Sequence, residues 1–261
     1  MDDVSDLVMQ QISELRTRLG DKIQDLDDKY ILRFLIARDH DIAKAEEMLR
    51  NHVEWKERIE YDQAHTWIID DVVQDSFQFC VDGKDKEGRL VVYCPVGAWH
   101  GRRMLEAGLG KELDRHLYHM AACMASALAK SNGDKLVGIL DLAELSYYKI
   151  AHYDTVQLTL RMLREREQNF PETLEAVIII NSPWVLDVIF PLIKPILGRS
   201  TLQKLEIYNS SPHKWMPVLL DRIQGGKFPS MFLKKHKYNM CHGSKNSPLK
   251  FSLQNIYFAT I

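Results

Sequence analysis

Glu172, Thr201 and Lys204 are polar residues whose types and spacing suit the binding of a phosphate group. Thr201 and Lys204 stand three residues apart, so a helical turn would place the hydroxyl and the ammonium on one face. A cation and a hydroxyl that converge in this way can hold one phosphate through charge-assisted hydrogen bonds. The same residues also suit plain structural roles, Glu172 as an acid at a helix end and Lys204 as a surface base. Spacing alone favours these structural roles.

The sequence lacks the usual motifs of catalysis and cofactor binding. There is no G-x-S-x-G elbow, which argues against an α/β-hydrolase. The absence of G-x-G-x-x-G and G-x-x-x-x-G-K-[ST] loops argues against nucleotide cofactors. His116 and His119 stand at i and i+3, but neither they nor His100 form a metal-type motif with the cysteines or with a third histidine. A structural role therefore explains them better than a metal site does.

Paired carboxylates are no stronger as candidates. Glu46-Glu47 and Glu165/Glu167 lie in amphipathic helical patterns, where solvent-exposed faces account for them. An enzyme that acts on lipid esters would need an activated nucleophile, and the sequence offers no convincing one. We therefore predict a protein that is not an enzyme, with no catalytic residue, no cofactor and no metal ion.

A very apolar segment lies between Glu172 and Thr201. Residues 176–180 predict a strand buried in a parallel sheet. Residues 184–197 predict a helix that is apolar around most of its circumference, with only one acid and one base. This helix is too short to span a bilayer. We expect a movable helix that covers a lipid cavity.

The rest of the pattern predicts a small helical bundle followed by an α/β layer. Residues 1–60 show amphipathic helices, two of them preceded by capping aspartates, Asp27 and Asp41. From about residue 75, apolar strands alternate with helices of ten or more residues, which is typical of a mostly parallel sheet. The expected strands are residues 90–94, 136–140, 177–180 and 205–208, and the expected helices are residues 115–130, 155–168 and 214–223.

Three regions follow from this pattern: an N-terminal helical module (1–70), an α/β lipid-binding domain (71–224) and a basic tail (225–261). The tail holds six lysines and no acid, whereas the preceding 224 residues hold 28 basic and 36 acidic residues. Because the tail also lacks periodicity, we expect it to be weakly packed. It would then be either an incidental terminus or a basic patch that meets anionic membranes.

Composition excludes several partners. A net charge of −2 gives no general attraction to nucleic acid. The four cysteines show no metal-type spacing, which favours reduced thiols in a cytoplasmic protein. The acidic N-terminus lacks the apolar core of a secretion signal, and no segment reaches the length of a membrane span. We expect a monomer that contacts membranes only transiently and peripherally.

Four stretches of the chain, taken in order, resemble the CRAL-TRIO family of lipid-binding proteins. They read YILRFLIARDHDIAKAEEMLRNHVEWK, DKEGRLVVY, VGILDLAELS and NFPETLEAVIIINSPWVLDVIFPLIKPIL, and the resemblance spans about residues 25–223. It implies a helical module packed on a mixed or parallel sheet with helices, and a hydrophobic cavity closed by a gate helix. It also implies exchange of single lipid molecules between membranes without chemical change. The chain resembles a short form that lacks the family's C-terminal GOLD domain.

The resemblance gives roles to particular residues. In the branch that carries phosphatidylinositol, one arginine, one glutamate, one threonine and one lysine hold the headgroup. The matching residues here are Arg38, Glu172, Thr201 and Lys204. The matching gate residues are Trp184, Val188, Ile189, Phe190 and Leu192, and the matching cavity residues are Leu136, Gly138 and Leu140.

One departure from the family pattern concerns the cavity strand. The phosphatidylcholine-binding branch has a serine and a threonine where this chain has Leu136 and Gly138, neither of which donates a side-chain hydrogen bond. We therefore predict that phosphatidylinositol is exchanged against a second, apolar lipid. The alternative is a carrier or sensor for one small hydrophobe, such as tocopherol, squalene or retinoid.

Overall fold

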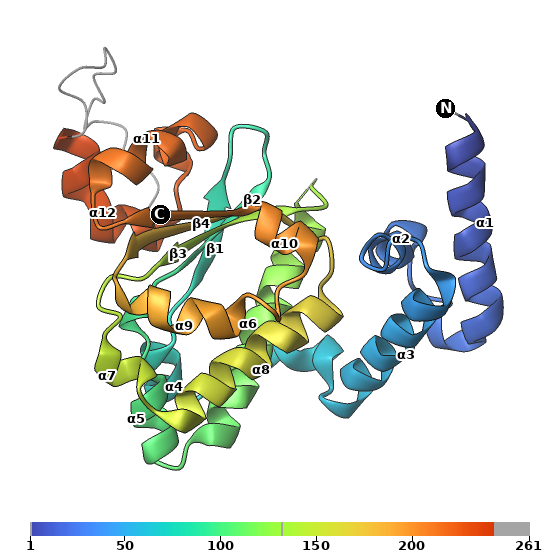
Figure 1. The fold of residues 1–261 in the computed structure, drawn as a ribbon, viewed down its shortest axis with the longest axis horizontal. Helices are drawn as coiled ribbons and strands as arrows, with labels where there is room; N and C mark the ends of the chain where they lie inside the picture. Colours follow the sequence, from blue (N-terminus) through green and yellow to red (C-terminus); the bar gives the residue numbers. More distant parts are fainter. Residues whose placement is uncertain (1, 132, 243–261) are drawn as a thin grey trace.

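The computed structural model describes residues 2–131 and 133–242, and it shows an N-terminal helical module beside a larger α/β body (Figure 1). The helices of the module are α1 (Asp2–Leu19), α2 (Asp28–Ile36) and α3 (Ile42–Arg58), with a 3₁₀ turn, η1 (Gly20–Ile23), between the first two. As expected, the Asp27 side chain caps α2 by accepting a hydrogen bond from the Tyr30 backbone N (2.7 Å). Asp41 caps α3 in the same way. These caps fix where each helix begins, so that their apolar faces meet in one core.

Five strands form the sheet of the body in the order β1-β2-β3-β4-β5. In that order they span Cys80–Lys84, Leu90–Cys94, Leu136–Asp141, Leu174–Ser182 and Leu205–Asn209. Strands β2 to β5 are parallel, and β1 pairs antiparallel with β2 at one edge. This confirms the predicted α/β class. The sequence pattern missed β1 because only one of its five residues is buried, and because it ends in Asp82, Gly83 and Lys84, which are typical of a turn.

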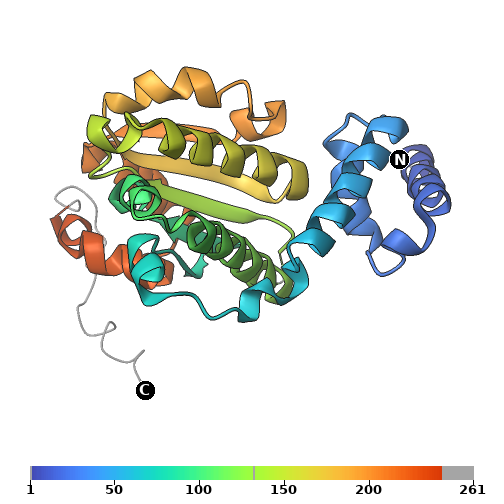
Figure 2. The same cartoon turned by 90° about the horizontal axis from the view of Figure 1, so that it is seen from below.

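Helices cover both faces of the sheet (Figures 1 and 2). One face carries α6 (Gly110–Lys130), α8 (Tyr153–Asn169) and α9 (Val185–Ile193), and the other carries α11 (Pro212–Arg222) and α12 (Ser230–His242). Short connecting helices are η2 (Tyr61–Thr66), α4 (Asp71–Ser76), η3 (Val96–Ala98), α5 (Gly101–Glu106), α7 (Tyr147–Ile150), α10 (Arg199–Gln203) and η4 (Gly225–Lys227).

Alternate residues of β3 serve the two faces. Val137 and Ile139 are buried in the cluster beneath α11 and α12. Leu136 and Leu140 point the other way and pack in the clusters beneath α6, α8 and α9. Because side chains alternate along a strand, one apolar segment can build a closed core on one side and a ligand site on the other.

The expectation that the tail is weakly packed is wrong for the part that the structure describes. Phe228 and Phe232 are buried in the main core, and His236 on α12 is buried against the sheet. These residues cover the face of the sheet that α11 leaves open. The sequence did not predict this packing because α12 has a weak apolar periodicity. Residues 243–261 lie outside the described residues, so the expectation for them stays a prediction.

The module joins the body through α3 and η2. The ring nitrogen Nδ1 of His52 lies 3.1 Å from Oδ1 of Asn169 at the end of α8. Trp55 packs edge-on against Phe170, with ring centroids 5.7 Å apart. At the surface, Lys29 Nζ lies 3.5 Å from Asp134 Oδ2. The module is thereby joined to the body at the end of α8 and at the segment before β3.

Candidate lipid-binding site

Glu172 and Lys204 form an ion pair where β4 and β5 begin. The turn before β4 holds Glu172 in a left-handed backbone conformation (φ 54°), which is uncommon for a residue other than glycine. Lys204 Nζ lies 2.9 Å from Glu172 Oε2, and Ser200 Oγ donates a hydrogen bond to the same oxygen over 3.1 Å. Burial by itself would raise the pKa of Glu172, but these two hydrogen bonds lower it overall. The carboxylate is therefore ionised at neutral pH.

Thr201 contacts a second carboxylate, that of Glu167 on α8. Thr201 Oγ1 donates to Glu167 Oε1 over 2.9 Å, and the Gly198 backbone N donates to Oε2 over 2.8 Å. Glu167 also forms an ion pair with its neighbour Arg166, whose Nη1 lies 3.5 Å from Thr201 Oγ1. Two acid–base pairs therefore lie beside α10, one reached by Ser200 and the other by Thr201.

The prediction that Glu165 and Glu167 lie on a solvent-exposed face is wrong. The Glu167 side chain is only 17% exposed and ties α10 to α8. Glu165 is half-buried and accepts a hydrogen bond from the Tyr118 hydroxyl (3.3 Å), and burial raises its pKa.

The topology contained a signal for Glu167. Helix α8 leads into β4, and α10 leads into β5, which is the parallel neighbour of β4. Parallel neighbours begin at the same edge of a sheet, so the end of α8 and the short α10 must lie close together. Charged residues in the last turn of α8 should therefore have been considered with Thr201 and Lys204.

Arg38 lies in the turn that follows α2, in the helical module. Its Nη1 donates to the Ala37 backbone oxygen over 2.9 Å. Among the residues that the structure describes, no hydrogen bond or ion pair joins Arg38 to Glu172, Thr201 or Lys204. Helix α2 lies on the side of the module that faces α10 (Figure 1). The headgroup role of Arg38 stays a prediction.

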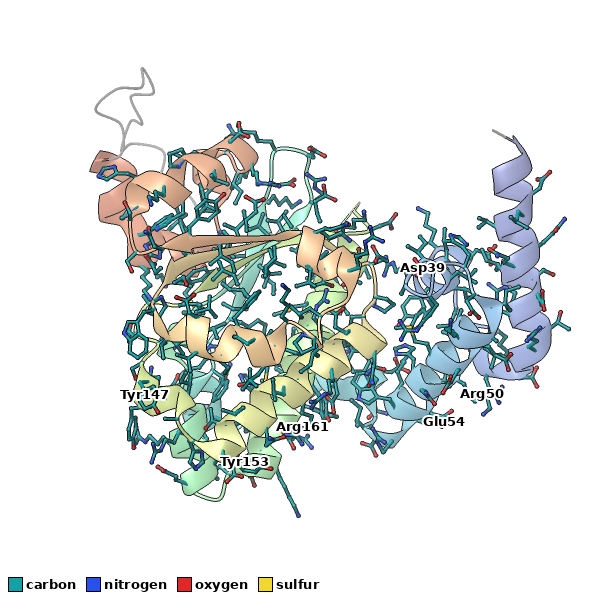
Figure 3. The ribbon with its side chains drawn as sticks, in the orientation of Figure 1. Asp39, Arg50, Glu54, Tyr147, Tyr153 and Arg161 are labelled. Carbon is teal, nitrogen blue, oxygen red and sulfur yellow. The ribbon has the colours of Figure 1, made fainter. Side chains whose placement is uncertain are left out.

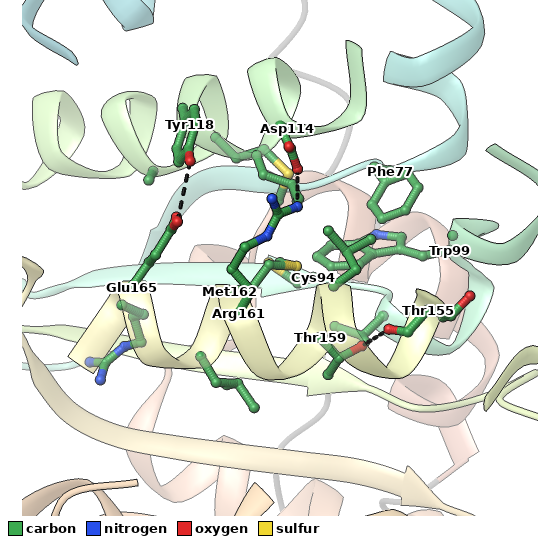
Figure 4. Close-up of a pocket in the computed structure, with 18 of the residues that line it drawn as sticks. Phe77, Cys94, Trp99, Asp114, Tyr118, Thr155, Thr159, Arg161, Met162 and Glu165 are labelled. Carbon is green, nitrogen blue, oxygen red and sulfur yellow. Dashed lines mark hydrogen bonds and ion pairs between the residues drawn. The ribbon is translucent and has the colours of Figure 1, made fainter. Parts of the chain in front are cut away.

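A cavity of about 400 Å³ lies between α6 and α8, and the carboxyl ends of β2 and β3 contribute to its wall (Figure 4). Its apolar lining includes Trp55, Phe77, Trp99, Met120, Met124 and Phe170. Burial raises the pKa of the Cys94 thiol in this wall to about 12, so the thiol is neutral at physiological pH. The volume is at the lower end of the range of ligand sites in proteins, roughly 300–1,000 Å³.

The charged residues of the cavity wall come mainly from α6 and α8. Asp114 on α6 forms an ion pair with Arg161 on α8 (Figure 4). Arg166, one turn further along α8, also belongs to the wall. Because Arg166 contacts Glu167 and approaches Thr201, it links the apolar cavity to the polar cluster around α10. The sequence did not single out Arg166.

The three expected cavity residues of β3 share the face that carries α6, α8 and α9. Leu140 lies in the cavity wall. Leu136 packs in both apolar clusters of this face. A Cβ atom added to Gly138 would lie 3.9 Å from Val177 Cγ2, an ordinary contact distance, so the space above this glycine could accept a methyl group.

The expected gate is α9, which is shorter than predicted. It spans Val185–Ile193 with Trp184 as its N-cap, whereas we expected a helix that extends to Leu197. Pro195 has no N–H to continue the helical hydrogen bonds, so the chain turns before α10. Pro191 lies inside α9, where it removes one more of these hydrogen bonds.

Helix α9 has one buried and one exposed apolar face. Ile189 is buried against the sheet, and Phe190 is half-buried in the same cluster. On the other side, Trp184, Val188 and Leu192 are 68%, 51% and 52% exposed. A spacing of four residues places these three in one row along the helix.

Aromatic residues of α7 and α8 extend this row. Tyr147 stacks on Trp184 with ring centroids 6.4 Å apart, and Arg102 lies over the Tyr148 ring at 4.0 Å. Tyr147 and Tyr153 lie at the same end of the body (Figure 3). We call these exposed residues the aromatic surface: Tyr147, Tyr148, Tyr153, Trp184, Val188 and Leu192.

No helix in the described part of the chain is both long and apolar enough to cross a membrane. Across residues 2–131 and 133–242, no three His, Cys, Asp or Glu side chains are arranged to hold a metal ion. His116 Nε2 lies 2.9 Å from the Phe77 backbone oxygen, and His119 Nδ1 lies 2.8 Å from that of Ala64. Both histidines therefore fix neighbouring backbone segments.

A mixed sheet with an apolar cavity on one face, beside a helix with an exposed apolar row, provides a space that can hold a hydrophobic ligand. The sequence profile of the CRAL/TRIO domain matches residues 74–231, which is more than half of the chain. The chain therefore belongs to the CRAL/TRIO family of lipid-binding domains, as the sequence motifs predicted.

Two known proteins show the extent of the similarity. The CRAL-TRIO domain-containing protein T23G5.2 of Caenorhabditis elegans is 26% identical over 194 residues, which cover 71% of this chain but only 27% of that protein. The chain thus spans about a quarter of the length of that relative. The crystal structure of Sfh5 superposes with a TM-score of 0.64 and 14% identity, over 81% of this chain and 83% of the Sfh5 chain. This second similarity supports the fold.

Proposed function

We propose that this chain binds one phosphatidylinositol molecule and carries it between membranes in exchange for a second, apolar lipid. The observation that supports this most strongly is the ion pair between Glu172 and Lys204 (2.9 Å) beside α10. Arg166 lies in the wall of the apolar cavity and 3.5 Å from Thr201 Oγ1, so the polar residues around α10 adjoin the cavity. Polar groups next to an apolar volume suit a ligand with a charged head and apolar tails. Exchange leaves the lipid unchanged, so no reacting group is needed.

Each polar residue of the site can take one part of the headgroup. Lys204 would pair with the phosphate, and Thr201 would add a hydrogen bond to the same group. The ionised carboxylate of Glu172 would accept hydrogen bonds from inositol hydroxyls and orient Lys204. Arg38 would reach the headgroup from the helical module. Equivalent residues would not be needed for an uncharged ligand, which has no phosphate to bind.

The apolar cavity would hide the acyl chains from water. At ~0.8 kcal/mol per buried CH₂, two chains of about sixteen carbons avoid more than roughly 20 kcal/mol of exposure. Such chains need more room than about 400 Å³, so part of the wall must move. The cavity wall and the apolar cluster beneath α9 share Val96, Leu140, Leu145 and Ile150. Displacement of α9 would therefore extend the existing cavity.

The aromatic surface would contact the membrane while α9 moves. Tryptophan and tyrosine concentrate at membrane–water interfaces because each has an apolar ring and a polar edge. Lys194, exposed just beyond α9, could meet lipid phosphates. In this proposal the protein is a cytoplasmic monomer that touches membranes transiently and does not bind nucleic acid.

The cavity volume favours a second candidate function. A space of about 400 Å³ between α6 and α8 suits one compact hydrophobe, such as a retinoid, without any movement of α9. In that case the polar cluster around α10 would hold helices together or contact membrane phosphoinositide. The chain would then act as a carrier or sensor.

The lipid that co-purifies with the recombinant protein separates the two functions. Native mass spectrometry should show a mass increase that matches phosphatidylinositol, and the same lipid should appear in an organic extract. Substitution Lys204→Ala should remove this lipid while Lys44→Ala, which breaks a surface ion pair with Asp41 at the start of α3, should not. A small hydrophobe that is retained equally by all three proteins would support the second function.

A further inference from the structure

Arg166 and Glu167 have no counterpart among the headgroup roles proposed above, yet they lie between the cavity and α10. The Arg166 side chain is 27% exposed and belongs to the cavity wall. Glu167 accepts hydrogen bonds from Thr201 and Gly198 and forms an ion pair with Arg166. Neither residue is therefore an ordinary surface charge.

Arg166 retains capacity to bind a ligand. A guanidinium group has five N–H donors. Among the described residues, its hydrogen bonds are made by Nη1 alone, to Glu167 Oε1 and, at 3.5 Å, to Thr201 Oγ1. Burial lowers the pKa of Arg166, which means that its charge is poorly solvated. An anion that enters the cavity could therefore accept hydrogen bonds from the remaining N–H groups of Arg166.

Charge balance restricts how such an anion can bind. Arg166 and Lys204 each face one carboxylate, Glu167 and Glu172 respectively, so the two pairs are already neutral. A phosphate would bind well only if one carboxylate moved away. Glu172 lies in a left-handed turn and accepts from Lys204 and Ser200. Glu167 occupies a hydroxyl and a guanidinium, and guanidinium groups are over-represented where proteins bind carboxylates and phosphates.

We propose that Glu167 holds the place of a lipid phosphate, and that a phosphate ester displaces its carboxylate from Arg166 and Thr201. Arg166 then binds the phosphate directly, together with Thr201 and Lys204. This inference rests on the proposed function, because it adds a residue to the same headgroup site. Displacement of Glu167 by a phosphate would make the site selective. Lipids that carry a phosphate would bind more tightly than lipids that have the same tails but no phosphate.

The contact between Glu167 and Gly198 can persist during this exchange. The Gly198 backbone N donates to Oε2, whereas Thr201 and the Arg166 ion pair use mainly Oε1. A Cβ atom at position 198 would lie 2.9 Å from Oε2, so a side chain there would crowd this hydrogen bond. Rotation of the carboxylate about the Gly198 contact would free Arg166 without releasing α10.

Three variants of the full chain test this inference. Glu167→Gln keeps an oxygen for the Gly198 N–H but removes the competing charge, so it should bind phosphatidylinositol about tenfold more tightly. Arg166→Gln should bind about tenfold more weakly. In the double variant Arg166→Gln/Glu167→Gln, the gain from Glu167→Gln should vanish. This double variant leaves no unpaired charge, so it guards against misfolding caused by an isolated arginine.

Binding would be measured with phosphatidylinositol in phosphatidylcholine vesicles, and with diacylglycerol of the same acyl chains as the matched lipid without phosphate. Diacylglycerol binding should be the same in all variants. An excess of inorganic phosphate should not displace bound phosphatidylinositol. Displacement would show that the site takes free phosphate, which would overturn the lipid assignment.

Two other results would also overturn the inference. If Lys204→Ala weakens phosphatidylinositol binding while both single variants match the wild type, the headgroup site stands but Glu167 and Arg166 only hold helices together. If Arg166→Gln weakens phosphatidylinositol and diacylglycerol equally, Arg166 supports the cavity wall and not a phosphate. Failure of the wild type to bind phosphatidylinositol at all would instead reject the proposed function itself.

Discussion

The two faces of the sheet use the same strands but pack in opposite ways. Beneath α11 and α12, large side chains such as Trp215 and Phe232 are fully buried against the strands. Beneath α6, α8 and α9, the packing leaves a cavity of about 400 Å³ and an exposed apolar row on α9. The closed face therefore supplies stability, and the open face can hold a ligand without loss of the fold.

One buried carboxylate on the closed face contrasts with Arg166 on the open face. Asp141, fully buried on the closed face, accepts hydrogen bonds from Tyr93 (2.8 Å) and Asn181 (2.8 Å). His236 Nε2 and Lys235 Nζ on α12 each lie 3.1 Å from its Oδ2. Every oxygen of this carboxylate is thus occupied, whereas Arg166 on the open face has donors left for a ligand. A complete network fixes structure, and an incomplete one leaves room for binding.

The largest expected effect is on the closed face. Phe232→Ala removes a fully buried ring from the main core, so the free energy of unfolding should fall by about 3–5 kcal/mol. Leu192→Ala on the exposed row of α9 is the matched control and should change the free energy of unfolding by less than about 0.5 kcal/mol. Urea denaturation followed by tryptophan fluorescence would measure both. Equal losses would mean that the two faces do not differ in packing.

Asp141→Asn should have the next largest effect and lower the free energy of unfolding by about 3 kcal/mol, because it leaves Lys235 without its buried partner. Burial alone would raise the pKa of Asp141, but hydrogen bonds from His236, Asn181 and others lower it well below its usual range. The stability that Asp141 contributes is therefore present above its unfolded pKa of about 3.9 and is lost as the pH falls through the lower folded value.

A series of urea midpoints at decreasing pH would check this dependence. The wild type should lose stability more steeply than Asp141→Asn in the acid range below about pH 4. Parallel curves would show that Asp141 does not anchor α12 to the sheet.

A smaller effect distinguishes the two faces of α9. Because Ile189 is buried, Ile189→Asp should destabilise the fold as well as slow lipid transfer. Slower transfer by this variant would therefore not show that α9 contacts the membrane. Val188→Asp, at an exposed position, should leave the melting temperature nearly unchanged while it slows transfer about tenfold, since a charge replaces apolar contact with the bilayer. Vesicle-to-vesicle transfer and thermal denaturation of both variants test this. Normal transfer by Val188→Asp would place membrane contact elsewhere.

The smallest expected effect concerns Lys194, next to the aromatic surface. Each lysine near an anionic membrane contributes up to about 1 kcal/mol, so Lys194→Ala should weaken binding to anionic vesicles about fivefold at low salt. The difference should shrink as salt screens the interaction. Vesicle co-sedimentation over a series of salt concentrations would measure it, with Lys44→Ala as the control. A salt-independent difference would argue against an electrostatic role.

Local sequence signals predicted most of the elements correctly. The caps at Asp27 and Asp41 and the apolar runs of β2 to β5 are short-range features, and the structure has helices and strands at these places. Helix α12 was missed because its inward residues include Lys235 and His236, which are polar and find their partner on β3. Local periodicity cannot show a contact between residues 95 positions apart.

The site was predictable in part. Glu172 and Lys204 were identified from the family resemblance, and the structure brings them into contact. Arg166 and Glu167 were not identified, because their helical pattern gives no indication that α10 and the cavity cover them. Only the pairing of β4 with β5 brings α8 and α10 together.

The central claim is that Lys204 binds the phosphate of a phosphatidylinositol molecule carried by this chain. The direct measurement is the transfer of phosphatidylinositol between vesicles by the wild type and by Lys204→Ala, with retinol as an uncharged ligand for comparison. Loss of a charge-assisted hydrogen bond should slow phosphatidylinositol transfer about 10- to 100-fold and leave retinol binding nearly unchanged. Equal losses for both ligands, or unchanged phosphatidylinositol transfer, would contradict the account.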